Sequence, residues 1–269
     1  MENCCEKCKK KTVCDYSFNN VVKDSFIEEI FWENSLKSPT TQKLLWEWID
    51  SKNVYTKFSG LSRKDFEHYS KHDESHSIAI LNVITAIIGK ERISSLGATD
   101  LWLLLHCAYG HDIGMHVPYA EVLDLWKNMK KGTSFYDFFE SCLLSDDLDL
   151  KKAACCINDC SKKIGVEINS VFDPEFSSEE LDTGWVAEIH RNCSYLTSEF
   201  IRRDHAKRSH HFRLEQCEMM EQYGTPAVDP RYYKIIAKCF ALHGCSLEEV
   251  LELQEHELDL DMGKCHPRF

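Results

Sequence analysis

The stretch Leu101–Met115, LWLLLHCAYGHDIGM, decides how this chain folds. Residues 99–109 are apolar on nearly every side of a helix, which predicts a buried central helix. The pair His111-Asp112 follows at the end of that helix, where a buried carboxylate without a partner is costly. A cation bound jointly by the imidazole and the carboxylate removes that cost. The alternative is that Asp112 caps the helix end and that His111 is an ordinary core histidine.

Apolar residues recur at helical spacing along most of the chain on either side of this stretch. The expected helices cover residues 24–34, 40–51, 62–68, 73–88, 99–109, 118–126, 134–144, 150–164, 178–203, 205–223, 230–243 and 247–257. Val166–Val171 is the single short candidate for a strand. The predicted fold class is therefore all-α, with a Cys/Lys-rich tail over residues 1–23 and one helical domain over residues 24–269.

Composition excludes several classes of protein. The 269 residues carry 32 Lys and Arg against 44 Asp and Glu, a formal charge of −12, which disfavours binding to duplex DNA. No apolar run approaches the ~18–20 residues of a membrane span. The N-terminus has no apolar signal segment, so a cytoplasmic location is expected.

Cysteine is unusually frequent, with 14 residues, and reduced thiols are expected in a cytoplasmic chain. Cys5 and Cys8 have the C-x2-C spacing of zinc ligands, and Cys4 and Cys14 lie nearby. A thiol-rich zinc site in the tail is therefore one alternative. The competing interpretation is a frayed tail without metal, because no second ligand pair follows at the usual distance.

Several of the 13 histidines lie where a metal could be bound. His72 and His76 are four residues apart at a helix start, which places them on one face, and His76 is expected to face the core with Ile80 and Val83. His243 ends a helix with an apolar face. Each of these histidines has a simpler explanation, as part of a solvated first turn or as a helix cap.

Residues 202–211, RRDHAKRSHH, form a basic run in an otherwise acidic chain, and His205 lies inside it. A basic helix in acidic surroundings suits a ligand that carries phosphate. The alternative is a solvated helix face whose charges pair with Glu215 and Glu218.

The ordered series of His76, then His111-Asp112, then His205, then His243 resembles the HD superfamily of metal-dependent phosphohydrolases. The resemblance is carried by HDESHSIAILNVI (72–84), LLLHCAYGHDIGM (103–115), RRDHAKRSHHF (202–212) and IIAKCFALHG (235–244). It is closest to the HD-CE type, found in bacterial conflict and defence proteins, often ahead of an Hsp90-like ATPase module. The resemblance implies an orthogonal helical bundle.

The same resemblance implies a metal-dependent phosphohydrolase that acts on a nucleotide or another phosphoester. His76, His111, Asp112, His205 and His243 would hold one or two divalent ions, of Mn, Fe, Zn, Co, Ni or Mg. Asp112 could bridge two ions, and a metal-bound hydroxide would attack phosphorus. Lys207 and Arg208 would neutralise charge on the phosphate.

One feature of the family pattern differs in this sequence. HD proteins usually supply a last metal-binding Asp from a late helix, which here would follow residues 266–269. The expectation is a domain whose last helix is missing. An alternative function is therefore a catalytically incomplete HD-fold module that binds a nucleotide or a protein. An Hsp90-like ATPase module or a second copy of the chain would be its protein partner.

Overall fold

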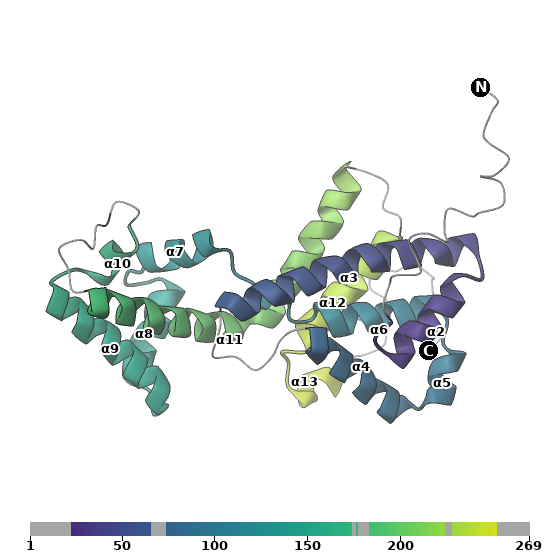
Figure 1. Cartoon of the computed structure of the whole chain (residues 1–269), viewed down its shortest axis with the longest axis horizontal. Helices are drawn as coiled ribbons and strands as arrows, with labels where there is room; N and C mark the ends of the chain where they lie inside the picture. The colour runs from purple at the N-terminus through teal and green to yellow at the C-terminus, as the bar shows by residue number, and fades with distance from the viewer. Residues whose placement is uncertain (1–22, 66–73, 174–175, 177–182, 224–227, 252–269) are drawn as a thin grey trace, which may run out of the picture.

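The computed structural model describes residues 23–65, 74–173, 176, 183–223 and 228–251, and its regular elements are all helical. The all-α prediction is therefore confirmed over this part of the chain (Figure 1). In chain order the elements are α2 (Phe26–Ser35), α3 (Pro39–Asp65), α4 (Glu74–Ile88), α5 (Lys90–Ser95), α6 (Ala98–Gly110), the 3-10 helix η2 (Ile113–Met115), α7 (Tyr119–Lys127), α8 (Ser134–Leu143), α9 (Leu148–Ile164), α10 (Ile168–Val171), α11 (Thr183–Tyr223), α12 (Pro230–Leu242) and α13 (Leu247–Leu251).

Two helices are longer than the sequence pattern predicts. α3 runs without a break to Asp65, where separate helices over 40–51 and 62–68 were expected. α11 is a single helix of 41 residues, where a boundary near residue 204 was expected. Both predicted boundaries were wrong because the junctions lack proline, and charged residues such as those of the basic run are good helix formers.

The one predicted strand is also wrong. Residues 168–171 form the short helix α10, in which the N–H of Ser170 bonds the carbonyl of Glu167 at 3.0 Å. Gly165 ends α9 with a left-handed φ of 67°, so the chain turns before an extended segment can form. The tail cysteines Cys4, Cys5, Cys8 and Cys14 and the histidine His72 lie outside the described residues.

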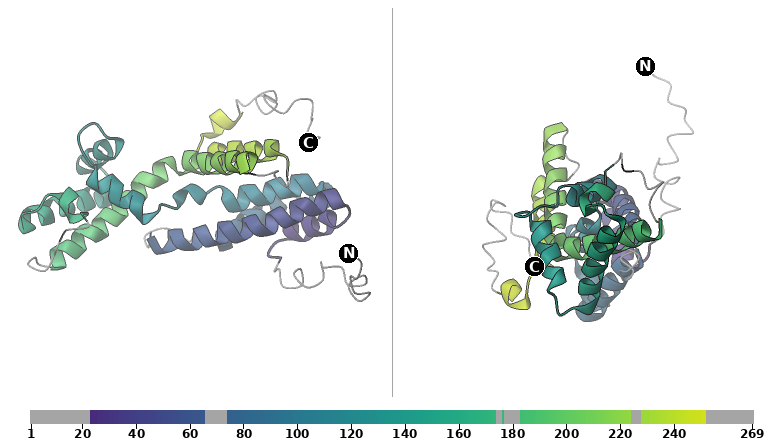
Figure 2. Two further views of the ribbon diagram at one scale, coloured as in Figure 1. Left: turned by 90° about the horizontal axis from the view of Figure 1, so that it is seen from above. Right: turned by 90° about the vertical axis from the view of Figure 1, so that its left-hand side faces the viewer.

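The helices gather into two lobes that share α11, as Figures 1 and 2 show. In the first lobe, α2–α6 and α12 enclose a core that includes Trp48, Trp102 and Phe240. The second, which we call the insertion lobe, contains α7–α10 and the N-terminal part of α11, and its core includes Trp126 and Ile189. Each lobe thus has its own hydrophobic core.

α6 lies at the centre of the first lobe, as its apolar sequence predicts. Leu101, Trp102 and Leu105 are fully buried in the core. The helix begins where the Asp100 carboxylate accepts a bond from the N–H of Gly97 at 3.0 Å, and it ends at Gly110. The pair His111-Asp112 leaves the core at the end of this buried helix, where it meets α4, α11 and α12.

Candidate metal centre

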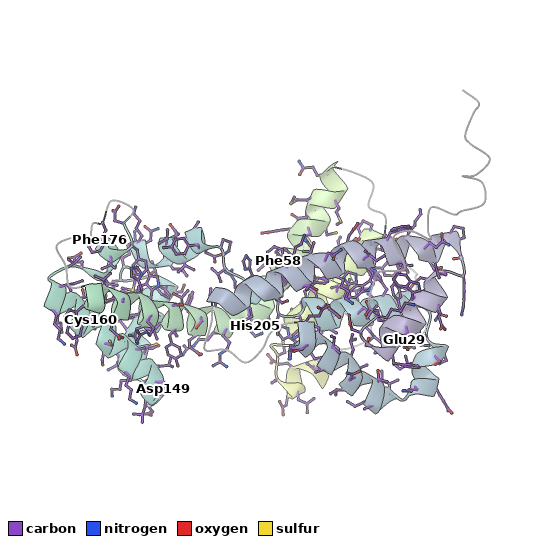
Figure 3. The ribbon with its side chains drawn as sticks, in the orientation of Figure 1. Glu29, Phe58, Asp149, Cys160, Phe176 and His205 are labelled. Carbon is purple, nitrogen blue, oxygen red and sulfur yellow. The ribbon has the colours of Figure 1, made fainter. Side chains whose placement is uncertain are left out.

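Five side chains from separate elements converge at the end of α6. His76 comes from α4, His111 caps α6, Asp112 precedes η2, His205 lies within α11 and His243 caps α12. Figure 3 places His205 along α11 near the junction of the two lobes. All five residues are those that the sequence indicated as metal ligands.

The Asp112 carboxylate is the centre of the group, and its two oxygens face different histidines. Oδ2 lies 2.9 Å from Nε2 of His111 and 3.6 Å from Nε2 of His76. Oδ1 lies 3.3 Å from Nε2 of His205 and 3.5 Å from Nε2 of His243. The donor atoms of each half, one with His76 and His111 and the other with His205 and His243, lie within 4.8 Å of one another.

Backbone carbonyls orient three of the imidazoles. Nδ1 of His111 lies 3.1 Å from the carbonyl of Ala108, and Nδ1 of His205 lies 2.6 Å from that of Arg202. Nδ1 of His243 lies 2.5 Å from the carbonyl of Phe240. A carbonyl can only accept, so each Nδ1 carries the hydrogen and each neutral ring presents its Nε2 lone pair to the centre. This is the usual second contact of a metal-ligating histidine.

The second half of the centre could hold a cation. Nε2 of His243 lies 2.8 Å from Nε2 of His205, and both face Oδ1 of Asp112. Two lone pairs and a carboxylate oxygen repel one another unless a proton or a metal ion lies between them. Without metal the hydrogen bond to Asp112 raises the pKa of His205. Imidazole and carboxylate donors also suit divalent transition metals, so the residues fit such an ion.

Two glycines allow the segments that carry candidate ligands to lie directly on α11. A Cβ on Gly114 would lie 2.2 Å from the carbonyl oxygen of His205. A Cβ on Gly244, next to His243, would lie 2.6 Å from the Cβ of Ala206. Larger residues at these positions would force the segments off α11, so both glycines fix the spacing of the His205 half.

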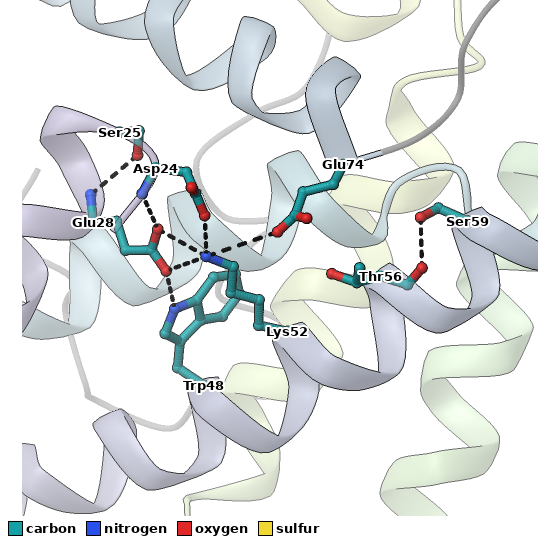
Figure 4. Close-up of polar contacts among 8 residues, drawn as sticks. All are labelled: Asp24, Ser25, Glu28, Trp48, Lys52, Thr56, Ser59 and Glu74. Carbon is teal, nitrogen blue, oxygen red and sulfur yellow. Dashed lines mark hydrogen bonds and ion pairs between the residues drawn. The ribbon is translucent and has the colours of Figure 1, made fainter. Parts of the chain in front are cut away.

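A partly buried lysine connects the start of α4, and with it His76, to the first lobe (Figure 4). Lys52 on α3 lies 2.7 Å from Asp24, 2.9 Å from Glu28 and 3.9 Å from Glu74, the first residue of α4. Burial alone would lower the pKa of Lys52, but Asp24 and Glu28 outweigh it and raise that pKa.

The predicted buried face of α4 was partly wrong. His76 is 37 % exposed, and Val83, which was expected on the same buried face, is 57 % exposed.

The basic run pairs differently from the expected alternative. Arg208 binds Glu121 of α7 in a fork, with Nη1–Oε1 2.6 Å and Nη2–Oε2 3.1 Å. Arg202 pairs with Glu199 on the same helix at 2.9 Å. Lys207 is exposed two residues from His205. The Arg208 and Arg202 contacts use neither Glu215 nor Glu218.

One histidine of α6 belongs to a cluster that sequence reasoning missed. His106 is fully buried, with Nε2 2.9 Å from Oε2 of Glu47 and Nδ1 2.8 Å from the hydroxyl of Tyr55. Arg213 approaches both Glu47, at 3.4 Å, and Nδ1 of His106, at 3.2 Å. Trp102 also donates to Glu47 at 2.8 Å. Glu47 and Arg213 are 166 residues apart, so no local pattern could have indicated the pair.

Charge within this cluster is balanced. Burial alone would raise the pKa of Glu47, but His106, Arg213 and the Ser51 hydroxyl outweigh it and lower that pKa to about 2. Burial lowers the pKa of His106, against the effect of Glu47. A neutral His106 donates from Nε2 to Glu47 and accepts at Nδ1, which leaves Arg213 as the cation that balances Glu47.

A pocket adjoins the first half of the centre. It encloses about 380 Å³, including the part open to solvent, and His76, His111 and Asp112 form one side of it. The rest of its wall includes the rings of Tyr55, Phe58 and Tyr109. The Tyr109 hydroxyl is buried and has no partner among the described residues. Burial, and then nearby Glu28, Glu74 and Asp24, raise the pKa of Tyr109, so the hydroxyl remains a donor.

The fold and these five converging side chains define a class of helical protein in which histidines and an aspartate can hold divalent metal ions. The sequence model of the HD-CE family matches residues 66–269, which include all five converging residues. The chain therefore belongs to the HD-CE family, and the resemblance to the HD superfamily is confirmed. HD domains typically bind divalent metals. No curated protein and no solved structure matches the chain.

Within the described residues, every helix is too short or too polar to cross a membrane.

Proposed function

We propose that this protein is a metal-dependent phosphohydrolase whose centre is Asp112 with His76, His111, His205 and His243. One observation carries the proposal: four Nε2 atoms meet the two oxygens of a single carboxylate, at 2.9 to 3.6 Å. When bound, a divalent cation supplies the Lewis acidity that such hydrolysis needs. Asp112 and the four histidines would hold one or two ions, and the backbone carbonyls would keep three imidazoles in the ligating tautomer.

The adjoining pocket favours an organic phosphoester, such as a nucleotide, over inorganic phosphate chains. Phe58 and the two tyrosine rings offer flat apolar surface for the organic group, while the described part of the wall contains no Lys or Arg. Exposed Lys207 would contribute positive charge near the phosphate.

The test compares the unmodified chain with the double variant His111→Ala/Asp112→Ala. We expect the unmodified chain to bind Mn²⁺, Co²⁺ or Zn²⁺ in roughly stoichiometric amounts, because its donor atoms converge. It should then hydrolyse at least one member of a panel of nucleotides and 4-nitrophenyl phosphate. The variant should lose both metal and turnover while its far-ultraviolet circular dichroism stays nearly unchanged. Metal content is measured by elemental analysis.

Two outcomes would contradict this function in different ways. Metal content that is unchanged in the double variant would mean that these residues do not form a metal centre. Stoichiometric metal without turnover on any phosphoester would favour the alternative, an HD-fold module that binds a nucleotide or a protein partner without hydrolysis.

A further inference from the structure

We propose that Arg208 and Ser209 are positioning residues, which hold residues 112–115 on α11. In this way they assemble the half of the centre that contains His205 and His243. The inference rests on the proposed function, because it assigns these residues a role in the same site. It differs from the expectation that Arg208 contacts phosphate, since the guanidinium is already bound to other groups of the protein.

Both backbone polar groups of Gly114 are held by these neighbouring residues of α11. The N–H of Gly114 donates to the Ser209 hydroxyl at 2.8 Å, and Ser209 is fully buried. Nε of Arg208 donates to the carbonyl of Gly114 at 3.0 Å. Gly114 lies two residues after Asp112, while Ser209 lies one helical turn after His205. The two bonds therefore set the separation between Asp112 and His205.

Arg208 extends the same connection to the insertion lobe. Its two terminal nitrogens bind Glu121, in the first turn of α7, at 2.6 and 3.1 Å. Nη2 also approaches the carbonyl of His116 at 3.5 Å. One guanidinium thus holds three points along residues 114–121, the segment that leads from the metal centre into α7.

The two halves of the centre should depend unequally on this connection. His111 and Asp112 are adjacent in the chain, and His76 is held through α4, which packs on α6 in the first lobe. His205 lies on α11, so its distance from Asp112 depends on how closely η2 packs on that helix. Loss of the bonds to Gly114 should weaken the His205 half and leave the His76 half nearly intact.

The experiment titrates the full-length chain with Co²⁺ by visible absorption and calorimetry. The variants are Ser209→Ala, Arg208→Gln and the conservative Arg208→Lys. Arg191→Gln is the matched control, because Arg191 pairs at 2.9 Å with Glu188 on the same helix, away from the centre. We expect Ser209→Ala and Arg208→Gln to weaken one Co²⁺ binding step by 10- to 100-fold and to spare the other. Arg208→Lys should recover part of the loss, and Arg191→Gln should behave like the unmodified chain.

Amide hydrogen exchange of the metal-free chain gives an independent readout. Exchange at residues 112–116 should accelerate in Ser209→Ala and in Arg208→Gln, while the core of α6 keeps its protection. Unchanged exchange, equal weakening of both Co²⁺ steps, or no weakening would overturn the inference and leave the proposed function standing. Failure of the unmodified chain to bind Co²⁺ would overturn both.

Discussion

His106 lies on α6 and His111 caps the same helix, and each faces a carboxylate, yet their surroundings are opposite in kind. The cluster of His106, Glu47 and Arg213 is buried and closed, because its own arginine balances the carboxylate. The cluster of His111 and Asp112 lies partly open to solvent, with side chains 16 % and 15 % exposed. There, several imidazoles present lone pairs to one carboxylate, and the balancing charge must come from a proton or a metal ion.

The difference teaches how a fold separates a structural ion pair from a binding site. A buried carboxylate is tolerated where its own oxygens have partners inside the protein. The Glu47 carboxylate meets this condition through Trp102, Ser51 and Arg213. Lone pairs that lie close together near solvent, as around Asp112, destabilise the protein when no cation is bound, and they coordinate a cation once it binds. The Glu47 cluster should therefore govern stability, and the Asp112 cluster should govern metal binding.

The largest expected effect on stability is that of Glu47→Gln. The change keeps the shape of the side chain but leaves the Arg213 charge uncompensated in the core, which costs about 3–5 kcal/mol of unfolding free energy. Urea unfolding of the metal-free chain measures it. The matched control is Glu33→Gln, since Glu33 is exposed on α2, and it should change stability by less than about 0.5 kcal/mol. A loss below about 1 kcal/mol for Glu47→Gln would show that the closed cluster does not stabilise the fold.

Acid should remove the contribution of the same cluster. The pKa of Glu47 is lowered from 4.5 to about 2 in the folded chain, so its contribution is present above about pH 4.5 and is lost as the pH falls toward 2. The shift corresponds to about 3 kcal/mol. His106, with a pKa below the usual 6.5, adds a loss that begins as the pH falls through 6.5. The stability difference between the unmodified chain and Glu47→Gln should therefore shrink from pH 5 to pH 2. A difference that stays constant over this range would contradict the assignment.

The sequence predicts the helix of the metal centre better than it predicts the centre itself. The apolar run that ends in His111-Asp112 identifies α6, because a helix so apolar can only be buried. The histidine spacing could not show that α4, α11 and α12 meet at that point. The family resemblance indicated five candidate ligands, and the structure brings all of them together.

Other features escaped because they depend on contacts between distant segments. Arg213 lies just beyond the basic run, but its partner Glu47 is on α3, and neither residue has a local signature. The prediction that the helix face of His76 and Val83 is buried was wrong, because helical periodicity shows which residues share a face but not which face is covered. The continuous α11 was missed because charge patterns do not end a helix when glycine and proline are absent.

The smallest predicted effect tests whether the two clusters act separately, since Tyr55 touches both. Its hydroxyl bonds Nδ1 of His106 at 2.8 Å, and its ring lines the pocket beside His111 and Asp112. Tyr55→Phe removes the hydroxyl alone, and Nδ1 of His106 keeps Arg213 at 3.2 Å. We expect a loss of about 1 kcal/mol in unfolding free energy and less than about a twofold change in Co²⁺ affinity. A change of tenfold or more in that affinity would mean that the buried cluster controls the metal centre through Tyr55, so that the two clusters do not act separately.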